Sequence, residues 1–214
     1  PLFPKDCNTI LDLFGGSGEV GLNSDFDTII YNEKSKPLVN IIQNFDTDFV
    51  QEVEECIITW NLSKINKQDF LTLREYYNKH KNILTSRENA VILYCLILHS
   101  FNNQLSFNSK GEYNTPAGYN RSWFNPKLKE KLLTYIETIQ SKNIRFLTLD
   151  FNEINIENIN SNTFVYCDPP YLATVGAYER DYFCKWSEDK EKELLTFLDT
   201  LNTYGIKFAL SNVL

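Results

Sequence analysis

Two kinds of apolar spacing alternate along the chain, and their order predicts an α/β fold. Short apolar runs rich in β-branched residues predict buried strands at 9–14, 26–33, 144–149, 163–167 and 206–210. Apolar residues at helical intervals predict helices over 34–45, in several pieces within 46–105, from Pro126 onward, and after the expected N-cap Ser187 to about 203. Strands that alternate with helices are typical of a parallel sheet, here interrupted by a long helical insert.

The helical insert differs from its flanks in charge. Residues 61–145 carry 13 Lys+Arg and 6 Asp+Glu, a net charge of +7, whereas the rest of the chain has a net charge of −14. A basic segment within an acidic frame predicts a surface for an anionic partner. We therefore divide the chain into one domain made of residues 1–45 and 144–214, and an insert of residues 46–143.

Length and composition exclude several classes of protein. No run of 18 apolar residues and no signal peptide is visible, which predicts a cytoplasmic protein without a membrane span. Five Cys without CxxC or Cys/His spacing argue against a disulfide framework or a zinc site. The chain contains no Met, opens on Pro1 and stops soon after a predicted strand, so we expect it to be truncated at both ends.

A glycine-rich turn follows the first predicted strand and supplies the first chemical signal. Gly16, Gly18 and Gly21 match GxGxxG, and we expect a helix after them. Glu33, at the end of the next strand, is placed to hold ribose hydroxyls. The pattern alone fits a dinucleotide or another adenosine-bearing cofactor equally. Glu19 would repel a pyrophosphate, which favours S-adenosylmethionine, and the absence of a Walker lysine disfavours a P-loop.

The second chemical signal is the tetrad Asp168-Pro169-Pro170-Tyr171, directly after a predicted strand. A carboxylate and a proline carbonyl can together accept both hydrogens of an exocyclic amino group, and the Tyr171 ring can stack on the base. Such acceptors bind more strongly as the nitrogen becomes cationic, which favours methyl transfer to a base nitrogen without a metal.

Together these motifs resemble the Dam-like DNA adenine-N6 methyltransferases, which have the order glycine motif, recognition insert, DPPY. ILDLFGGSG (10–18), YNEKSKPLVN (31–40) and FLTLDF (146–151) look like the family's cofactor segments, and ALSN (209–212) like the strand beside its target pocket. FNSKGEYNTPAG (107–118) is similar to its DNA-contacting hairpin. The resemblance implies a Rossmann-like S-adenosylmethionine-dependent fold, with 1–45 and 144–214 as catalytic domain and 46–143 as target-recognition insert.

The resemblance also implies a function and site residues. The function is site-specific transfer of a methyl group to N6 of a flipped adenine in duplex DNA. Asp168, Pro169, Pro170 and Tyr171 would be catalytic. The residues implied to bind the cofactor are Asp12, Phe14, Gly15, Gly16, Ser17, Gly18, Glu33, Asp150, Phe151 and Asp168.

The basic insert would hold the DNA while the adenine is extruded. Phosphate candidates are Lys110, Arg121, Lys127, Lys129 and Lys131. Asn108, Tyr113, Asn114 and Tyr119 are candidates for reaching base edges or wedging into the stack. We expect double-stranded DNA as partner, a restriction endonuclease as a further partner, no membrane, and a monomer.

Three other functions stay open at this point. N4-cytosine methylation uses the same amine chemistry. A dinucleotide-dependent oxidoreductase would use GxGxxG but leaves the tetrad and the basic insert unexplained. A catalytically silent DNA-binding module is the third.

Overall fold

The structure is a computed structural model that describes residues 3–171 and 186–211 of the 214-residue chain. It divides into two compact units. The sheet unit contains the described parts of residues 1–39, 141–179 and 183–214, and the helical unit contains residues 40–140. The functional assignment of the two predicted domains remains a prediction.

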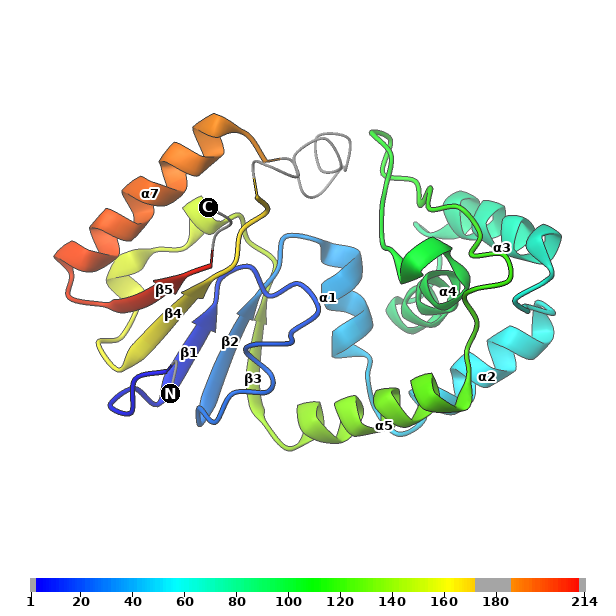
Figure 1. The fold of residues 1–214 in the computed structure, drawn as a ribbon, viewed down its shortest axis with the longest axis horizontal. Helices are drawn as coiled ribbons and strands as arrows, with labels where there is room; N and C mark the ends of the chain where they lie inside the picture. Colours follow the sequence, from blue (N-terminus) through cyan, green and yellow to red (C-terminus); the bar gives the residue numbers. More distant parts are fainter. Residues whose placement is uncertain (1–2, 172–185, 212–214) are drawn as a thin grey trace. The chain divides into compact units, whose positions relative to one another are not determined.

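Five parallel strands form the sheet unit (Figure 1). They are β1 (Thr9–Asp12), β2 (Thr28–Asn32), β3 (Asn143–Leu147), β4 (Thr163–Cys167) and β5 (Lys207–Leu210). Their order is β3-β2-β1-β4-β5, so the chain moves outward from β1 first to one side and then to the other. This is the beginning of the Rossmann strand order, and it confirms the predicted α/β class. All five predicted strands are present, close to their predicted bounds.

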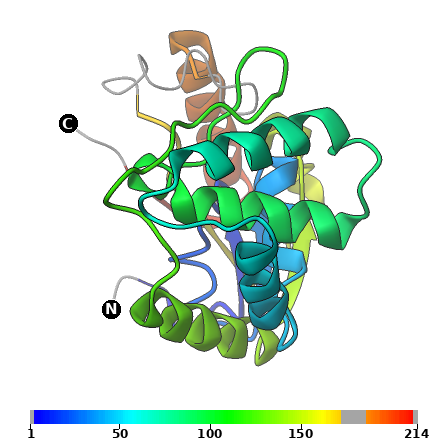
Figure 2. The same cartoon turned by 90° about the vertical axis from the view of Figure 1, so that its right-hand side faces the viewer.

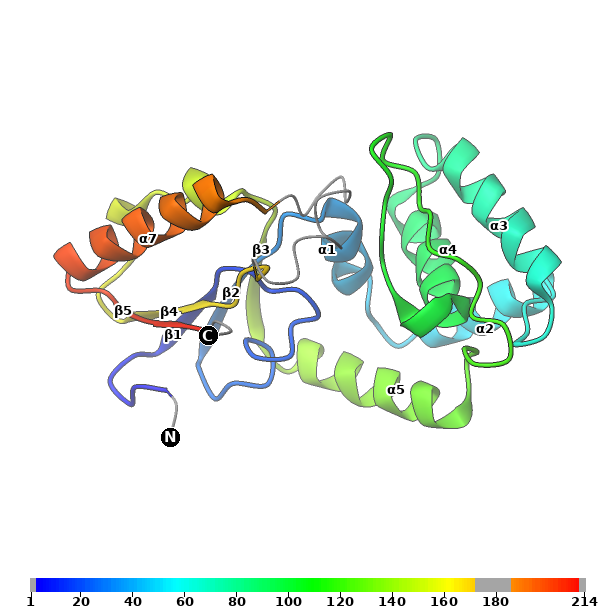
Figure 3. The same cartoon turned by 45° about the horizontal axis from the view of Figure 1, so that its top comes forward.

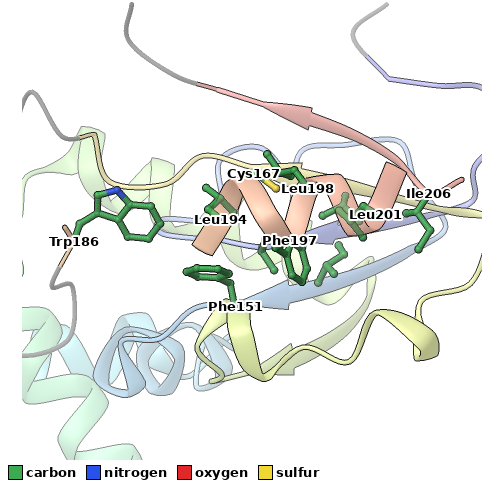
Figure 4. Close-up of a cluster of buried hydrophobic side chains, with 11 residues drawn as sticks. Phe151, Cys167, Trp186, Leu194, Phe197, Leu198, Leu201 and Ile206 are labelled. Atoms are coloured by element: carbon green, nitrogen blue, oxygen red, sulfur yellow. The ribbon is translucent and has the colours of Figure 1, made fainter. Parts of the chain in front are cut away.

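Helix α7 (Glu188–Thr203) covers the sheet on the side of β4 and β5 (Figures 1 and 3). Ser187 caps it as predicted, because the Ser187 side chain accepts a hydrogen bond from the Lys190 N–H. The cluster in Figure 4 fills the space between helix and sheet, where Leu194, Phe197 and Leu201 of α7 are all buried. Burying side chains of this size contributes about 1.5–3 kcal/mol each. The short 3₁₀ turns η2 (Phe151–Glu153) and η3 (Ile156–Asn158) precede β4.

The helix predicted after the glycine turn is absent, so that prediction was wrong. Residues 13–27 form successive turns between β1 and β2. Gly16 and Gly18 have φ of +49° and +77°, which a right-handed helix does not allow. A single bond of helical spacing, from the Leu22 N–H to the Gly18 carbonyl, closes at 3.0 Å. Each of the three glycines lowers helix stability by about 1 kcal/mol. In so short a segment the remaining helical hydrogen bonds do not offset the free-energy cost of helix nucleation.

The helical unit is built around one buried helix. Its elements are α1 (Lys36–Gln43, which begins in the sheet unit), α2 (Phe49–Thr59), α3 (Lys67–His80), α4 (Ser86–His99), η1 (Phe101–Asn103) and α5 (Pro126–Gln140). Helices α2 and α3 both pack on α4, and Figure 2 shows α3 beside α4. Helix α4 is apolar on most of its surface, and a capping box between Thr85 and Glu88 begins it.

The predicted hairpin in 107–118 is a loop closed by one antiparallel bridge, between Phe107 and Tyr113. Two α3 side chains one turn apart hold its returning limb. Asn78 donates to the Tyr113 carbonyl at 3.0 Å and accepts from the Tyr113 N–H at 2.8 Å, and Arg74 donates to the Thr115 carbonyl at 3.1 Å. The hairpin backbone is therefore bound to a helix rather than to a sheet.

Candidate functional site

The site lies where the strand order changes direction. Strands β1 and β4 pair in parallel in the centre of the sheet, with Asp12 opposite Tyr166. Their carboxyl ends therefore meet at one edge, and the glycine turn follows one strand while Asp168 follows the other (Figure 1). In open parallel sheets such a switch point is where ligands bind.

Close approach between β1 and β2 shapes the glycine turn. The Gly15 N–H donates to the Asn32 carbonyl at 2.7 Å, and a Cβ at Gly15 would lie 2.3 Å from a ring carbon of Tyr31. Tyr31 is fully buried, and its hydroxyl donates to the Gly16 carbonyl at 2.5 Å. A Cβ at Gly16 would meet nothing closer than 3.9 Å, so this residue leaves open space above the turn.

Two polar residues at the end of β2 hold the glycine turn through hydrogen bonds. The Asn32 side chain donates to the carbonyls of Leu13 and Leu149 at 2.9 and 3.1 Å, and it accepts from the Leu149 N–H at 3.0 Å. Glu33 accepts from the Gly16 N–H at 3.0 Å and from the Ser35 N–H at 2.7 Å. The carboxylate predicted to hold a ribose therefore also holds the backbone of the glycine turn.

Asp12 is a buried carboxyl group beneath the turn. Only 2% of the residue is exposed, and its Oδ2 accepts from the Gly21 N–H at 3.0 Å. Burial raises the pKa of Asp12 to about 6; the Gly21 N–H opposes this, and the charges of Asp168 and Glu33 add to it. Three carboxyl groups thus influence one another at this edge of the sheet, which favours a cationic ligand over an anionic one.

Aromatic rings and ion pairs form the wall opposite the tetrad. The Phe14 ring contacts those of Phe151 and Trp186, with centroids 5.7 and 5.6 Å apart. Asp150 pairs with Lys34 at 2.7 Å and with Lys190 at 3.5 Å. Burial raises the pKa of Asp150, but the hydrogen bonds from Lys34 and the Asn152 N–H and the charges of Lys34 and Lys190 together outweigh burial, so the net shift is downward.

Hydrogen bonds within the tetrad and to the end of β5 meet at the Tyr171 hydroxyl. The Tyr171 hydroxyl donates to Asp168 Oδ1 at 2.5 Å and lies 2.9 Å from the Ser211 Oγ. Pro169 is buried and Pro170 is half-buried, and both line the same cavity as Asp168 and Tyr171.

One cavity of about 260 Å³ joins both motifs. Among the predicted site residues, those that line it are Phe14, Gly16, Glu33, Asp150, Phe151, Asp168, Pro169, Pro170 and Tyr171. Four predicted cofactor residues are not among its lining: Asp12, Gly15, Ser17 and Gly18. Asp12 and Gly15 are buried beneath the turn, Gly18 closes it through a 2.7 Å bond to the Gly15 carbonyl, and Ser17 is exposed.

Sequence reasoning did not single out five residues of this site: Asn32, Lys34, Trp186, Lys190 and Ser211. Asn32 carried a signal, because a polar residue at the end of an apolar strand is buried only where its amide is bonded. Lys34 lies in the segment 31–40 and Ser211 in the segment 209–212, both of which carried the family resemblance, but neither residue was named. Trp186 and Lys190 carried no signal, because they reach the cavity from a distant part of the chain.

The predicted DNA-contacting residues separate into two groups. Lys110, Asn114, Tyr119 and Arg121 are exposed on the helical unit. Tyr113 is 1% exposed, and its hydroxyl donates to the Gln104 carbonyl at 3.1 Å, so its prediction as a base reader was wrong. The extended backbone directs alternate side chains to opposite sides, which turns Tyr113 inward and Asn114 outward.

Two other predicted contacts are engaged within the helical unit. The Asn108 side chain donates to Glu112 at 2.8 Å and accepts from the N–H groups of Lys110 and Glu112 at 2.9 and 3.0 Å, so it stabilises the hairpin tip. Among the lysines proposed for phosphates, Lys129 pairs with Glu54 at 2.7 Å.

Exposed aromatic rings covered by cations form a feature that the sequence did not indicate. The Arg121 guanidinium lies 5.7 Å from the centroid of the Phe101 ring, and the Lys64 ammonium lies 5.9 Å from that of Trp123. Phe101 is 39% and Trp123 is 41% exposed. We call these four residues the aromatic-cation patch.

The family model for D12 class N6 adenine-specific DNA methyltransferases matches residues 1–213. The chain belongs to this family. It is 40% identical to modification methylase StsI of Streptococcus sanguinis and 41% identical to type II methyltransferase M.FokI of Planomicrobium okeanokoites, each over the whole chain. A DNA adenine methylase of Haemophilus influenzae is 28% identical over 79% of the chain and 57% of its own length.

This D12-class chain spans about a third of the length of StsI and M.FokI. Membership of the family implies S-adenosylmethionine as methyl donor. In the described ranges 3–171 and 186–211, no three His, Cys, Asp or Glu side chains gather as a metal site would require. No helix in that part of the chain has the length and apolar character to cross a membrane.

Asp12→Asn should make stability less dependent on pH. Because the folded pKa of Asp12 is about 6 and its ordinary value is 3.8, the protonated carboxyl stabilises the fold at low pH, and this contribution disappears as the pH rises through 6. The difference between these two pKa values corresponds to about 3 kcal/mol of the free energy of unfolding. Urea unfolding from pH 4 to 8 should show the variant gaining stability over wild type as the pH rises. A constant difference across that range would contradict the assignment.

Gly15→Ala should lower the free energy of unfolding by about 1–3 kcal/mol, because the new methyl group overlaps the buried Tyr31 ring. Urea unfolding measures it, and in a Tyr31→Leu background the further cost should be smaller. Gly205→Ala is the control: its Cβ meets nothing within 4 Å, and only its φ of +67° costs energy, about 1–2 kcal/mol. An equal cost of Gly15→Ala in both backgrounds would exclude the steric explanation.

Proposed function

We propose that this chain provides the methyl-transfer site of a site-specific DNA adenine N6-methyltransferase that acts on a flipped adenine in duplex DNA. One observation carries the proposal: a single cavity is lined both by the glycine turn with Glu33 and by the tetrad 168–171. A cofactor and an exocyclic amine can therefore occupy adjoining parts of one site.

The residues present fit S-adenosylmethionine. Gly16 leaves space that a side chain would fill, and the carboxyl groups of Asp12, Glu33 and Asp168 give the site negative potential. When bound, S-adenosylmethionine supplies a methyl group on a sulfonium centre. In the proposed arrangement Glu33 takes the ribose hydroxyls, while Asp150 and Phe151 hold the adenine of the cofactor.

The tetrad supplies the differential binding that the reaction needs. Asp168 and the Pro169 carbonyl accept the two amino hydrogens of the target adenine, and the Tyr171 ring stacks on the base. Both acceptors bind more strongly as the nitrogen gains positive charge, which lowers the barrier rather than only tightening the ground state. Each such preorganised interaction is worth about 2.7–4 kcal/mol in comparable sites.

The helical unit supports the DNA side of the proposal. Arg121, Lys110, Asn114 and Tyr119 are exposed, and the aromatic-cation patch joins ring faces to positive charge, a combination that suits phosphates and unstacked bases. We propose that the protein acts as a monomer. Two relatives are named modification methylase and type II methyltransferase, which supports a restriction endonuclease as a further partner.

The alternatives account for fewer of the observations. A dinucleotide oxidoreductase would place its pyrophosphate at a helix N-terminus, but turns follow the glycines. A silent DNA-binding module leaves the cavity and the tetrad unexplained. N4-cytosine methylation uses the same tetrad chemistry, and the adenine-specific family match favours adenine.

Asp168→Asn should reduce methyl transfer at least 100-fold, because an amide NH2 takes the place of an acceptor at the target amine. The measurement is transfer of tritium from labelled S-adenosylmethionine to whole-genome-amplified bacterial DNA by the full-length protein. Asp199→Asn, at an exposed position on α7, is the matched control. Digestion of the product should yield N6-methyladenine. Equal transfer by Asp168→Asn and wild type, or N4-methylcytosine as product, would overturn the proposal.

Arg121→Gln should weaken DNA binding and reduce the magnitude of the slope of log K against log salt by about 1, as expected when one phosphate contact is lost. Fluorescence anisotropy with a labelled duplex over a series of salt concentrations measures the slope. Lys192→Gln, a 73% exposed lysine on α7, is the control and should leave the slope unchanged. Equal slopes for Arg121→Gln and wild type would remove Arg121 from the DNA contacts.

A further inference from the structure

Ser211 lies beside the tetrad because the β4–β5 ladder continues past the end of both strands. Cys167 is the register partner of Leu210, and the Ser211 N–H donates to the Cys167 carbonyl at 2.8 Å. Asp168 and Ser211 are the first residues after their strands, so parallel pairing brings them to the same edge. The position of Ser211 is therefore set by backbone bonds and does not depend on its side chain.

The Ser211 hydroxyl lies 2.9 Å from the Tyr171 hydroxyl. The Tyr171 hydroxyl has one hydrogen, and it donates that hydrogen to Asp168 Oδ1 at 2.5 Å. In this arrangement Ser211 is accordingly the donor to the Tyr171 oxygen.

This arrangement places the Tyr171 hydroxyl on the carboxylate that the reaction needs. A hydrogen bond from a hydroxyl to a carboxylate is charge-assisted and strong, so it withdraws part of the negative charge of Asp168. The amine of the target base requires that charge, most of all as the nitrogen becomes cationic. The Ser211 Oγ, 2.9 Å from the Tyr171 hydroxyl, is an acceptor within reach of that hydroxyl when it leaves Asp168.

We propose that Ser211 is a positioning residue that takes over the Tyr171 hydroxyl when Asp168 engages the target amine. The inference rests on the proposed function. The Tyr171 ring keeps its place, and only hydroxyl hydrogens turn: Tyr171 donates to the Ser211 oxygen, and the Ser211 hydrogen turns away from Tyr171. No covalent bond forms or breaks in this exchange.

A purely structural role for Ser211 gives a different expectation. If Ser211 only packs beside β4, its removal has the same effect whether or not Tyr171 carries a hydroxyl. If Ser211 receives that hydroxyl, its removal matters only while the hydroxyl is present. The two roles are therefore separated by a double-mutant cycle rather than by a single substitution.

The experiment measures single-turnover methyl transfer from tritiated S-adenosylmethionine to whole-genome-amplified bacterial DNA by the full-length protein. Four proteins form the cycle: wild type, Ser211→Ala, Tyr171→Phe and the double variant. Ser211→Ala should slow transfer about 3- to 10-fold in the wild-type background, the effect of one lost hydrogen bond. It should have no further effect in the Tyr171→Phe background. Ser211→Thr, which keeps the hydroxyl, should restore the rate, and Ser161→Ala, at an exposed serine, is the matched control.

The outcomes distinguish this inference from the function on which it rests. Equal slowing by Ser211→Ala in both backgrounds, or no slowing in either, would overturn the role of Ser211 and leave the proposed function standing. A slow Ser211→Thr variant that folds as wild type does would also overturn it. Absence of transfer by the wild-type protein would overturn the proposed function, and this inference with it.

Discussion

The parallel pairing of β1 with β4 is the constraint on which the site depends. Strands β2 and β3 lie on one side of β1, and β4 and β5 lie on the other, so the turns after β1 and β4 diverge and leave a crevice between them. Every residue assigned to the cofactor or to the tetrad follows a strand of this sheet, except Asp12, which is the last residue of β1. A change of register by one residue would reverse the faces of the strand and separate the two motifs.

Burial at this edge serves binding at the expense of stability. Asp12 is a carboxyl group at a position where burial disfavours its charged form. Gly15 leaves room for the Tyr31 ring, and the Tyr31 hydroxyl donates a hydrogen bond to the Gly16 carbonyl. The charged groups that line the cavity are Glu33, Asp150 and Asp168 together with Lys34 and Lys190, and both lysines pair with Asp150. In the helical unit, exposed cations lie over exposed rings.

The strands and the main motifs could be predicted because each depends on neighbours in sequence. An apolar run bounded by glycine or proline forms a strand wherever it finds a partner, and Ser187 caps α7 through a bond three residues away. The helix expected after the glycines failed for a local reason, because the turn with positive φ at Gly16 and Gly18 leaves only a short segment before β2. The outward Tyr113 failed because a residue distant in sequence, Asn78 of α3, holds its backbone and the ring is buried.

The sequence by itself determined the α/β class, the order of the motifs and the residue types of the tetrad, because periodicity and local chemistry are properties of short segments. Only the tertiary structure decided which residues share the cavity. Trp186, just before α7, and Lys190 in its first turn line the cavity, far along the chain from the glycine turn. Ser211, just after β5, contacts the Tyr171 hydroxyl of the tetrad. Their contribution depends on strand order and helix packing, which arise from long-range burial that no local pattern contains.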